Sequence, residues 1–111
     1  MDRATNDQPD IFGIFVATPP GSRKSETALE LAEKAVMSGQ KVQIFLYRPG
    51  VNNLRDQRYV RLLERGVTIY ACSQSCQAHG ITAIPDNIVL GELGLLASLM
   101  SGCQKFVAFI R

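Results

Sequence analysis

The sequence has no tryptophan, a single histidine and no large excess of charge of either sign. Its 111 residues carry 12 basic and 10 acidic side chains, for a formal net charge of +2. A protein that follows a nucleic-acid backbone usually presents a basic stripe interleaved with aromatic side chains, and no such stripe is visible here. We therefore expect no direct nucleic-acid partner.

Long apolar runs are also missing. Residues 1–10 are polar and include three aspartates, so they do not look like a signal peptide or a membrane anchor. The most apolar stretch, residues 93–100, is far shorter than the roughly 20 residues that cross a bilayer. We expect a flexible tail over residues 1–10, one domain over residues 11–111, no membrane association and a cytoplasmic location.

Cysteine is scarce and its number is odd. Three cysteines cannot all pair within one chain, and a chain of this length can bury a core without disulfide bonds or a structural metal. Each thiol is therefore expected either to fill space in the core or to take part in chemistry.

The apolar residues that are present indicate an α/β fold. Continuous apolar runs such as residues 11–17 predict strands that are covered on both faces, as in parallel sheets. Strands are predicted over residues 11–17, 42–47, 67–71 and 106–110, with a short strand or extended loop within residues 81–90. Between them are predicted a helix ending at Gly39, a short helix over residues 59–64 that ends at Gly66, a short helix or turn over residues 72–79 and an apolar helix over residues 92–101. We predict a three-layer sandwich: a mainly parallel sheet of four to five strands with helices on both faces.

In such a sheet, ligands gather at the carboxyl ends of the strands. Three segments follow strand ends: residues 18–25, residues 47–53 and the turn that begins at Cys72. The first carries two cations and one glycine, but it lacks the second glycine and the Gly-Lys-Ser/Thr arrangement of a phosphate-binding loop. No dinucleotide-binding glycine pattern and no Ser-His-Asp set is present, so we expect no cofactor.

Cys72 is the strongest candidate for chemistry. It follows a predicted strand and precedes a predicted helix start, where unpaired amides and the helix dipole favour an anion such as a thiolate. The thiolate is the nucleophile in sulfur exchange. The alternative is that Cys72 is a small buried residue at a strand end.

Two residues near Cys72 invite further hypotheses. Cys76 lies four residues later, on the same face of a helix, and would act as a second thiol or pack inward. His79 would serve as an acid–base partner of the thiolate or lie at the surface. Together with Cys72 they offer three possible zinc ligands, but a second closely spaced ligand pair is missing, so we expect no metal. Cys103 is expected to be packing.

The segment Tyr47-Arg48-Pro49-Gly50-Val51-Asn52-Asn53 resembles the Tyr-Arg-x-Gly-Val-x-Asn segment of the DsrE/DsrF/TusD-like sulfur-relay family. The position of Cys72 ahead of Gly80-Ile81 is similar to that of the family's persulfide-carrying cysteine. The closing segment around Cys103 also resembles the family, and the resemblance covers residues 11–109.

The resemblance implies a DsrE-like fold and a protein that accepts sulfane sulfur as a persulfide on Cys72 and passes it on. It implies sulfur donor and acceptor proteins as partners, in sulfur oxidation or transfer-RNA thiolation. Tyr47, Arg48, Gly50 and Asn53 would line the pocket, with Cys76 and His79 as accessory residues.

The resemblance also implies a homo-oligomer, trimer or hexamer, or a hetero-oligomer with related subunits. The apolar helix over residues 93–100 independently favours self-association, because it exceeds what one stripe of a monomer core needs. Two alternatives stay open: a non-catalytic oligomer subunit or small-anion-binding module, and a dithiol redox protein that uses Cys72 and Cys76.

Overall fold

Five parallel strands form the centre of the protein in a computed structural model that describes residues 10–111. They are β1 (Ile11–Val16), β2 (Lys41–Leu46), β3 (Thr68–Cys72), β4 (Val89–Gly91) and β5 (Lys105–Phe109). Their order in the sheet is β4-β3-β2-β1-β5, and every neighbouring pair is parallel. All five carboxyl ends therefore lie at one edge of the sheet, and the predicted fold class is confirmed.

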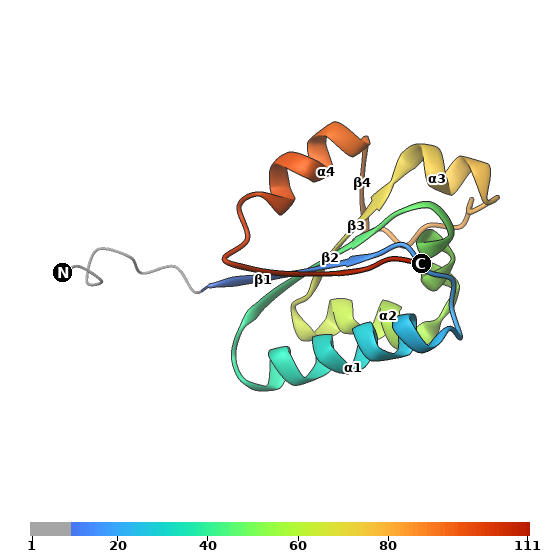
Figure 1. The fold of residues 1–111 in the computed structure, drawn as a ribbon. Coiled ribbons are helices and arrows are strands. Elements are labelled where there is room, and N and C mark those ends of the chain that lie inside the picture. Colours follow the sequence, from blue (N-terminus) through green and yellow to red (C-terminus); the bar gives the residue numbers. More distant parts are fainter. Residues whose placement is uncertain (1–9) are drawn as a thin grey trace.

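Helices lie on both faces of this sheet. The α-helices are α1 (Arg23–Met37), α2 (Gln57–Val60), α3 (Ser73–Ala78) and α4 (Leu93–Met100), and the 3₁₀ helices are η2 (Arg48–Arg55) and η3 (Arg61–Arg65). Figure 1 shows α1 and α2 below the sheet and α3 and α4 above it. Within residues 10–111, no helix is both long enough and apolar enough to span a membrane. Residues 1–9 of the expected flexible tail lie outside the described residues.

Alternation along the strands divides the core into two clusters. In β2, Val42, Ile44 and Leu46 belong to the larger cluster, which includes the buried alanines and Leu29 of α1. Phe45 points to the opposite face and belongs to a smaller cluster with Leu96 of α4. The strands thus read as continuously apolar because both of their faces pack against protein.

Local signals place the ends of the helices. The Ser22 hydroxyl caps α1 by accepting a hydrogen bond from the Ser25 amide at 3.2 Å. Gly39 after α1 and Gly66 after η3 have φ values of +83° and +90°, a conformation that glycine adopts without a steric cost. The predicted ends at both glycines are confirmed.

The connection after β2 differs from the sequence prediction. Residues 47–53 were expected to be a loop, but η2 occupies Arg48–Arg55, with Pro49 in its first turn. The single short helix predicted over residues 59–64 is divided into α2 and η3. A short strand or extended loop was predicted within residues 81–90, and the strand observed there, β4 (Val89–Gly91), is confined to the end of that range.

Candidate functional site

Cys72 lies at the carboxyl end of β3, and α3 begins at the next residue. The strand's alternation points its side chain to the α4 side of the sheet, where it packs in the smaller cluster with Phe45 and Leu96. Only 2% of Cys72 is exposed. The residue is therefore held rigidly between a strand and a helix start, as the sequence predicts.

Cys72 borders a hollow of about 210 Å³. Its other lining residues come from two segments, the start of η2 and α3: Tyr47, Arg48, Gln74, Ser75, Ala78 and His79. Cys72 is thus one of the residues that line this hollow, although it is almost fully buried. Two of the three predicted strand-end segments thus meet at this hollow.

Arg48 has an unusual backbone at the rim of this hollow. Its φ is +52°, and within residues 10–111 no other residue except glycine has a positive φ. The Arg48 N–H donates a hydrogen bond of 2.8 Å to the Ser75 hydroxyl, and the Arg48 guanidinium lies 5.2 Å from the centre of the Tyr47 ring. A non-glycine residue in this region carries strain, and such strain is concentrated at functional sites. Ser75 holds Arg48 in this conformation.

Gly50 and Asn53 support the site without lining the hollow. A Cβ on Gly50 would lie 2.0 Å from the Val16 carbonyl oxygen, so only glycine permits η2 to approach the end of β1. The buried Asn53 amide donates hydrogen bonds of 3.0 Å to the carbonyl oxygens of Thr18 and Gly50. These contacts fix the segment that carries Tyr47 and Arg48.

A buried hydroxyl network extends this support, and no sequence pattern indicated it. The Ser25 hydroxyl lies 2.7 Å from that of Thr18 and donates to the Thr18 carbonyl at 2.9 Å. The Tyr59 hydroxyl donates to the Ser25 carbonyl at 2.7 Å, and burial raises the pKa of Tyr59. Ser75 was also missed. The sequence feature that could have identified Ser75 is a hydroxyl side chain in the first turn of the helix predicted after Cys72.

Cys76 lies apart from the hollow. It is 2% exposed and packs in the larger core cluster, whereas Cys72 belongs to the smaller one. Burial, with a smaller contribution from Cys72, raises the pKa of the Cys76 thiol, which opposes thiolate formation. The structure places this residue in the core.

His79 does reach the hollow. It is exposed at the end of α3, and its Nδ1 lies 3.2 Å from the Asn52 side-chain nitrogen. In the part of the chain that the structure describes, no hydrogen bond joins His79 to Cys72. Over residues 10–111, no group of three His, Cys, Asp or Glu residues is arranged to hold a metal ion.

Cys103 packs against the sheet. Its Sγ lies near Leu99 O at 3.8 Å, and a Cβ on Gly13 would lie 2.6 Å from that sulfur. Burial raises the pKa of the Cys103 thiol. The contacts fit a packing role.

Comparison with known proteins gives a family and a fold. Residues 10–109 match the model of the DsrE/DsrF-like family. The structure is similar to that of the YchN protein of Escherichia coli, with a TM-score of 0.73, 22% identity, and coverage of 92% of this chain and 100% of that one. It is also similar to a conserved protein of unknown function from Bacteroides thetaiotaomicron, with a TM-score of 0.75, 20% identity, and coverage of 97% and 99%. No curated protein sequence matches the chain.

Proposed function

The chain belongs to the DsrE/DsrF-like family, and on that basis we propose that it is a sulfur carrier that accepts sulfane sulfur on Cys72 and passes it to a partner protein. The observation that carries the proposal is the position of Cys72. Cys72 lies at a strand end, directly before α3, and borders a hollow that Arg48 also lines. A carrier needs such a single, positioned thiol.

The chemistry is an exchange between sulfur atoms. The Cys72 thiolate attacks the terminal sulfur of a donor persulfide, the donor's S–S bond breaks, and the donor leaves as a thiolate. The product is a Cys72 persulfide, and no external oxidant or reductant is consumed. Arg48, which lines the same hollow as Cys72, is the residue whose positive charge would pair with the sulfur anions.

Sulfur loading is tested by intact mass after incubation with glutathione persulfide. We expect the wild type to gain one sulfur atom and Cys72→Ser to gain none. Cys103→Ser is the matched control, because it removes a free thiol from another position and should load as the wild type does. Equal loading of Cys72→Ser and the wild type would refute the proposal.

A second candidate is a subunit in which Cys72 is inert packing. It is favoured by the low exposure of Cys72 and its contacts with Phe45 and Leu96. The rate of alkylation by iodoacetamide at neutral pH separates the two functions. A Cys72 that reacts no faster than Cys103 would favour the inert subunit. A dithiol function has no support in the packing, because Cys76 lies in the other core cluster.

We further propose that copies of this chain or related subunits assemble through the α4 side. Several large apolar side chains there are 40–50% exposed: Val89, Leu93, Leu95 and Phe106. Exposed apolar side chains that gather on one side of a protein usually mark an interface. The sulfur donor and acceptor proteins would then approach the carboxyl edge of the sheet.

A further inference from the structure

Two more hollows continue the Cys72 hollow along the carboxyl edge of the sheet. The second, of about 390 Å³, shares Tyr47 and Arg48 with the first and is also lined by Arg111. The third, of about 490 Å³, shares Arg111 with the second and extends to Arg23 and Lys24 at the start of α1. We call these three adjoining hollows the carboxyl-edge track.

The charged side chains that line this track all carry positive charge. Arg48, Arg111, Arg23 and Lys24 line it, and no aspartate or glutamate lines any of its three hollows. The whole chain nevertheless contains 10 acidic residues, almost as many as its 12 basic ones. No acidic side chain therefore lines these hollows, which follow the carboxyl ends of four strands, β3, β2, β1 and β5.

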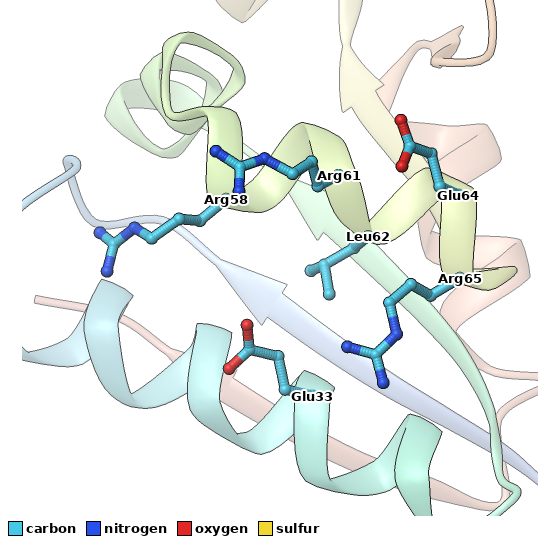
Figure 2. A pocket seen from close by; sticks show the side chains of 6 residues that line it. All are labelled: Glu33, Arg58, Arg61, Leu62, Glu64 and Arg65. Atoms are coloured by element: carbon cyan, nitrogen blue, oxygen red, sulfur yellow. The ribbon is translucent and has the colours of Figure 1, made fainter.

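A different hollow of the same protein shows what a compensated cationic surface looks like. It is lined by Arg58, Arg61 and Arg65, but also by Glu33 and Glu64. Figure 2 shows Glu33 on α1 across this hollow from Arg65. Arg58 in addition forms ion pairs with Glu26 and Asp56. Arg58 thus has partners within the chain, and two glutamates line the same hollow as the other two arginines, so this surface has little need of an external anion.

The segments that make up the track are tied together. The Ala17 amide donates to the Phe109 carbonyl at 2.9 Å, and the Lys24 ammonium donates to the Ile110 carbonyl. Arg48 lines both the first and the second hollow, and its backbone, which has a positive φ, is held by the hydrogen bond from its N–H to the Ser75 hydroxyl. The cations therefore come from three separate segments but keep a fixed order along the edge.

Apolar side chains lie between these cations. Phe15, Pro49 and Ile110 line the second hollow beside Tyr47, whose ring lies 5.8 Å from that of Phe15. A small anion such as a free persulfide needs only the first hollow. Cations spread over three hollows, with apolar surface between them, suit an extended chain that alternates carboxylates with apolar side chains.

We propose that the carboxyl-edge track docks an acidic peptide segment of the protein that exchanges sulfur with Cys72. This inference rests on the proposed carrier function and names the chemistry of its partner. The segment's carboxylates pair with Arg48, Arg111 and the α1 cations, while its persulfide or thiol enters the Cys72 hollow. Docking thus converts sulfur exchange between two proteins into a reaction between positioned groups.

The docking test uses a labelled synthetic peptide of alternating glutamate and leucine, and a matched peptide with glutamine in place of glutamate. Binding to the Cys72→Ser protein is followed by fluorescence anisotropy, so that no sulfur chemistry intervenes. We expect the acidic peptide to bind at least about tenfold more tightly than the neutral one at low salt, and to weaken as salt is added. Equal binding of the two peptides, or no binding of either, would overturn the proposal.

Matched charge variants locate the surface. The double variant Arg23→Gln/Lys24→Gln should bind the acidic peptide about three- to tenfold more weakly. The control Arg61→Gln/Arg65→Gln removes the same charge from the compensated hollow and should change affinity less than about twofold. Equal losses in the two variants would mean that net charge alone attracts the peptide, which contradicts a track.

Arg48→Gly removes one cation of the track and also relieves the strained backbone at the start of η2. Glycine adopts a positive φ readily, so the midpoint of urea unfolding should not fall, while peptide affinity should drop about two- to fivefold. Loading of the wild type by glutathione persulfide separates the two proposals. Loading without peptide docking overturns only the track, whereas docking without loading overturns the carrier function.

Discussion

The two faces of the sheet are covered to very different degrees. Beneath the sheet, α1 runs for 15 residues and buries five of them, and the central strands add fully buried side chains such as Ile14 and Ile44. Above it, α4 has eight residues and only Leu96 is buried. The exposed Leu95 and Phe106 lie on elements of this second side.

This difference shows which surface the chain completes by itself. A parallel sheet is normally covered on both faces, and an apolar face left partly open costs free energy in water. The α1 side meets that requirement within one chain. The α4 side meets it only in part, which is why we assign it to subunit contacts. Three predictions test the distinction.

The largest effect is expected from Ile44→Ala on the complete side. Ile44 is fully buried in β2, and its truncation should lower the free energy of unfolding by about 2–5 kcal/mol. The measurement is urea unfolding followed by circular dichroism. Leu95→Ala on α4 is the matched variant and, in dilute protein, should cost less than about 0.5 kcal/mol because Leu95 is 50% exposed. Similar losses for both would show that the α4 side is as complete as the α1 side.

Assembly should respond in the opposite way. Leu95→Asp puts a charge into the apolar α4 surface, and we expect it to shift the protein from oligomer to monomer in light scattering coupled to size exclusion. Met37→Asp is the control, since Met37 is 76% exposed at the end of α1. If the wild type is monomeric, or if both variants assemble equally well, the α4 side is not an interface.

Much of this architecture could be predicted from local pattern. Continuous apolar runs identified β1, β2 and β3, because the residues of a strand that is buried on both faces are nearly all apolar. Gly39 and Gly66 marked helix ends because glycine is common at the positive φ that follows a helix, and both residues have a positive φ in the structure. The position of Cys72 between β3 and α3 followed from the same reasoning. These features depend on residues that are close together in the chain.

The remaining features depend on contacts between distant residues. The 3₁₀ helix η2 is fixed by Asn53, which bonds to Thr18, and by the approach of Gly50 to Val16. The local sequence does not show these contacts with Thr18 and Val16, so Pro49 and Gly50 alone predicted a loop. For the same reason the segment over residues 47–53 predicted Gly50 and Asn53 as pocket residues. In the structure they hold η2 in place and are not among the residues that line the hollow. Whether a side chain lines a site or holds it is decided by packing that the local sequence does not contain.

The smallest effect is expected from the ion pairs that join α1 to the start of α2 on the complete side. Within residues 10–111, both ion pairs involve Arg58, which binds Glu26 of α1 and Asp56, the N-cap of α2. Hydrogen bonds from Arg58 lower the pKa of Glu26 and of Asp56 below their ordinary values of 4.5 and 3.8.

A carboxylate whose pKa is lowered by folding stabilises the protein above the unfolded pKa, and the contribution disappears as pH falls through the folded pKa. Arg58→Gln should therefore lower the urea midpoint slightly at pH 7, and the difference from the wild type should shrink as the pH drops below about 4. The difference should also shrink in 1 M salt, because Arg58 is exposed and salt screens such pairs. Arg65→Gln, which removes a neighbouring charge without breaking these pairs, should show neither trend. A deficit in Arg58→Gln that is the same at every pH would mean that Arg58 stabilises the α1 side through packing of its side chain, and that the complete face owes its advantage to apolar contacts alone.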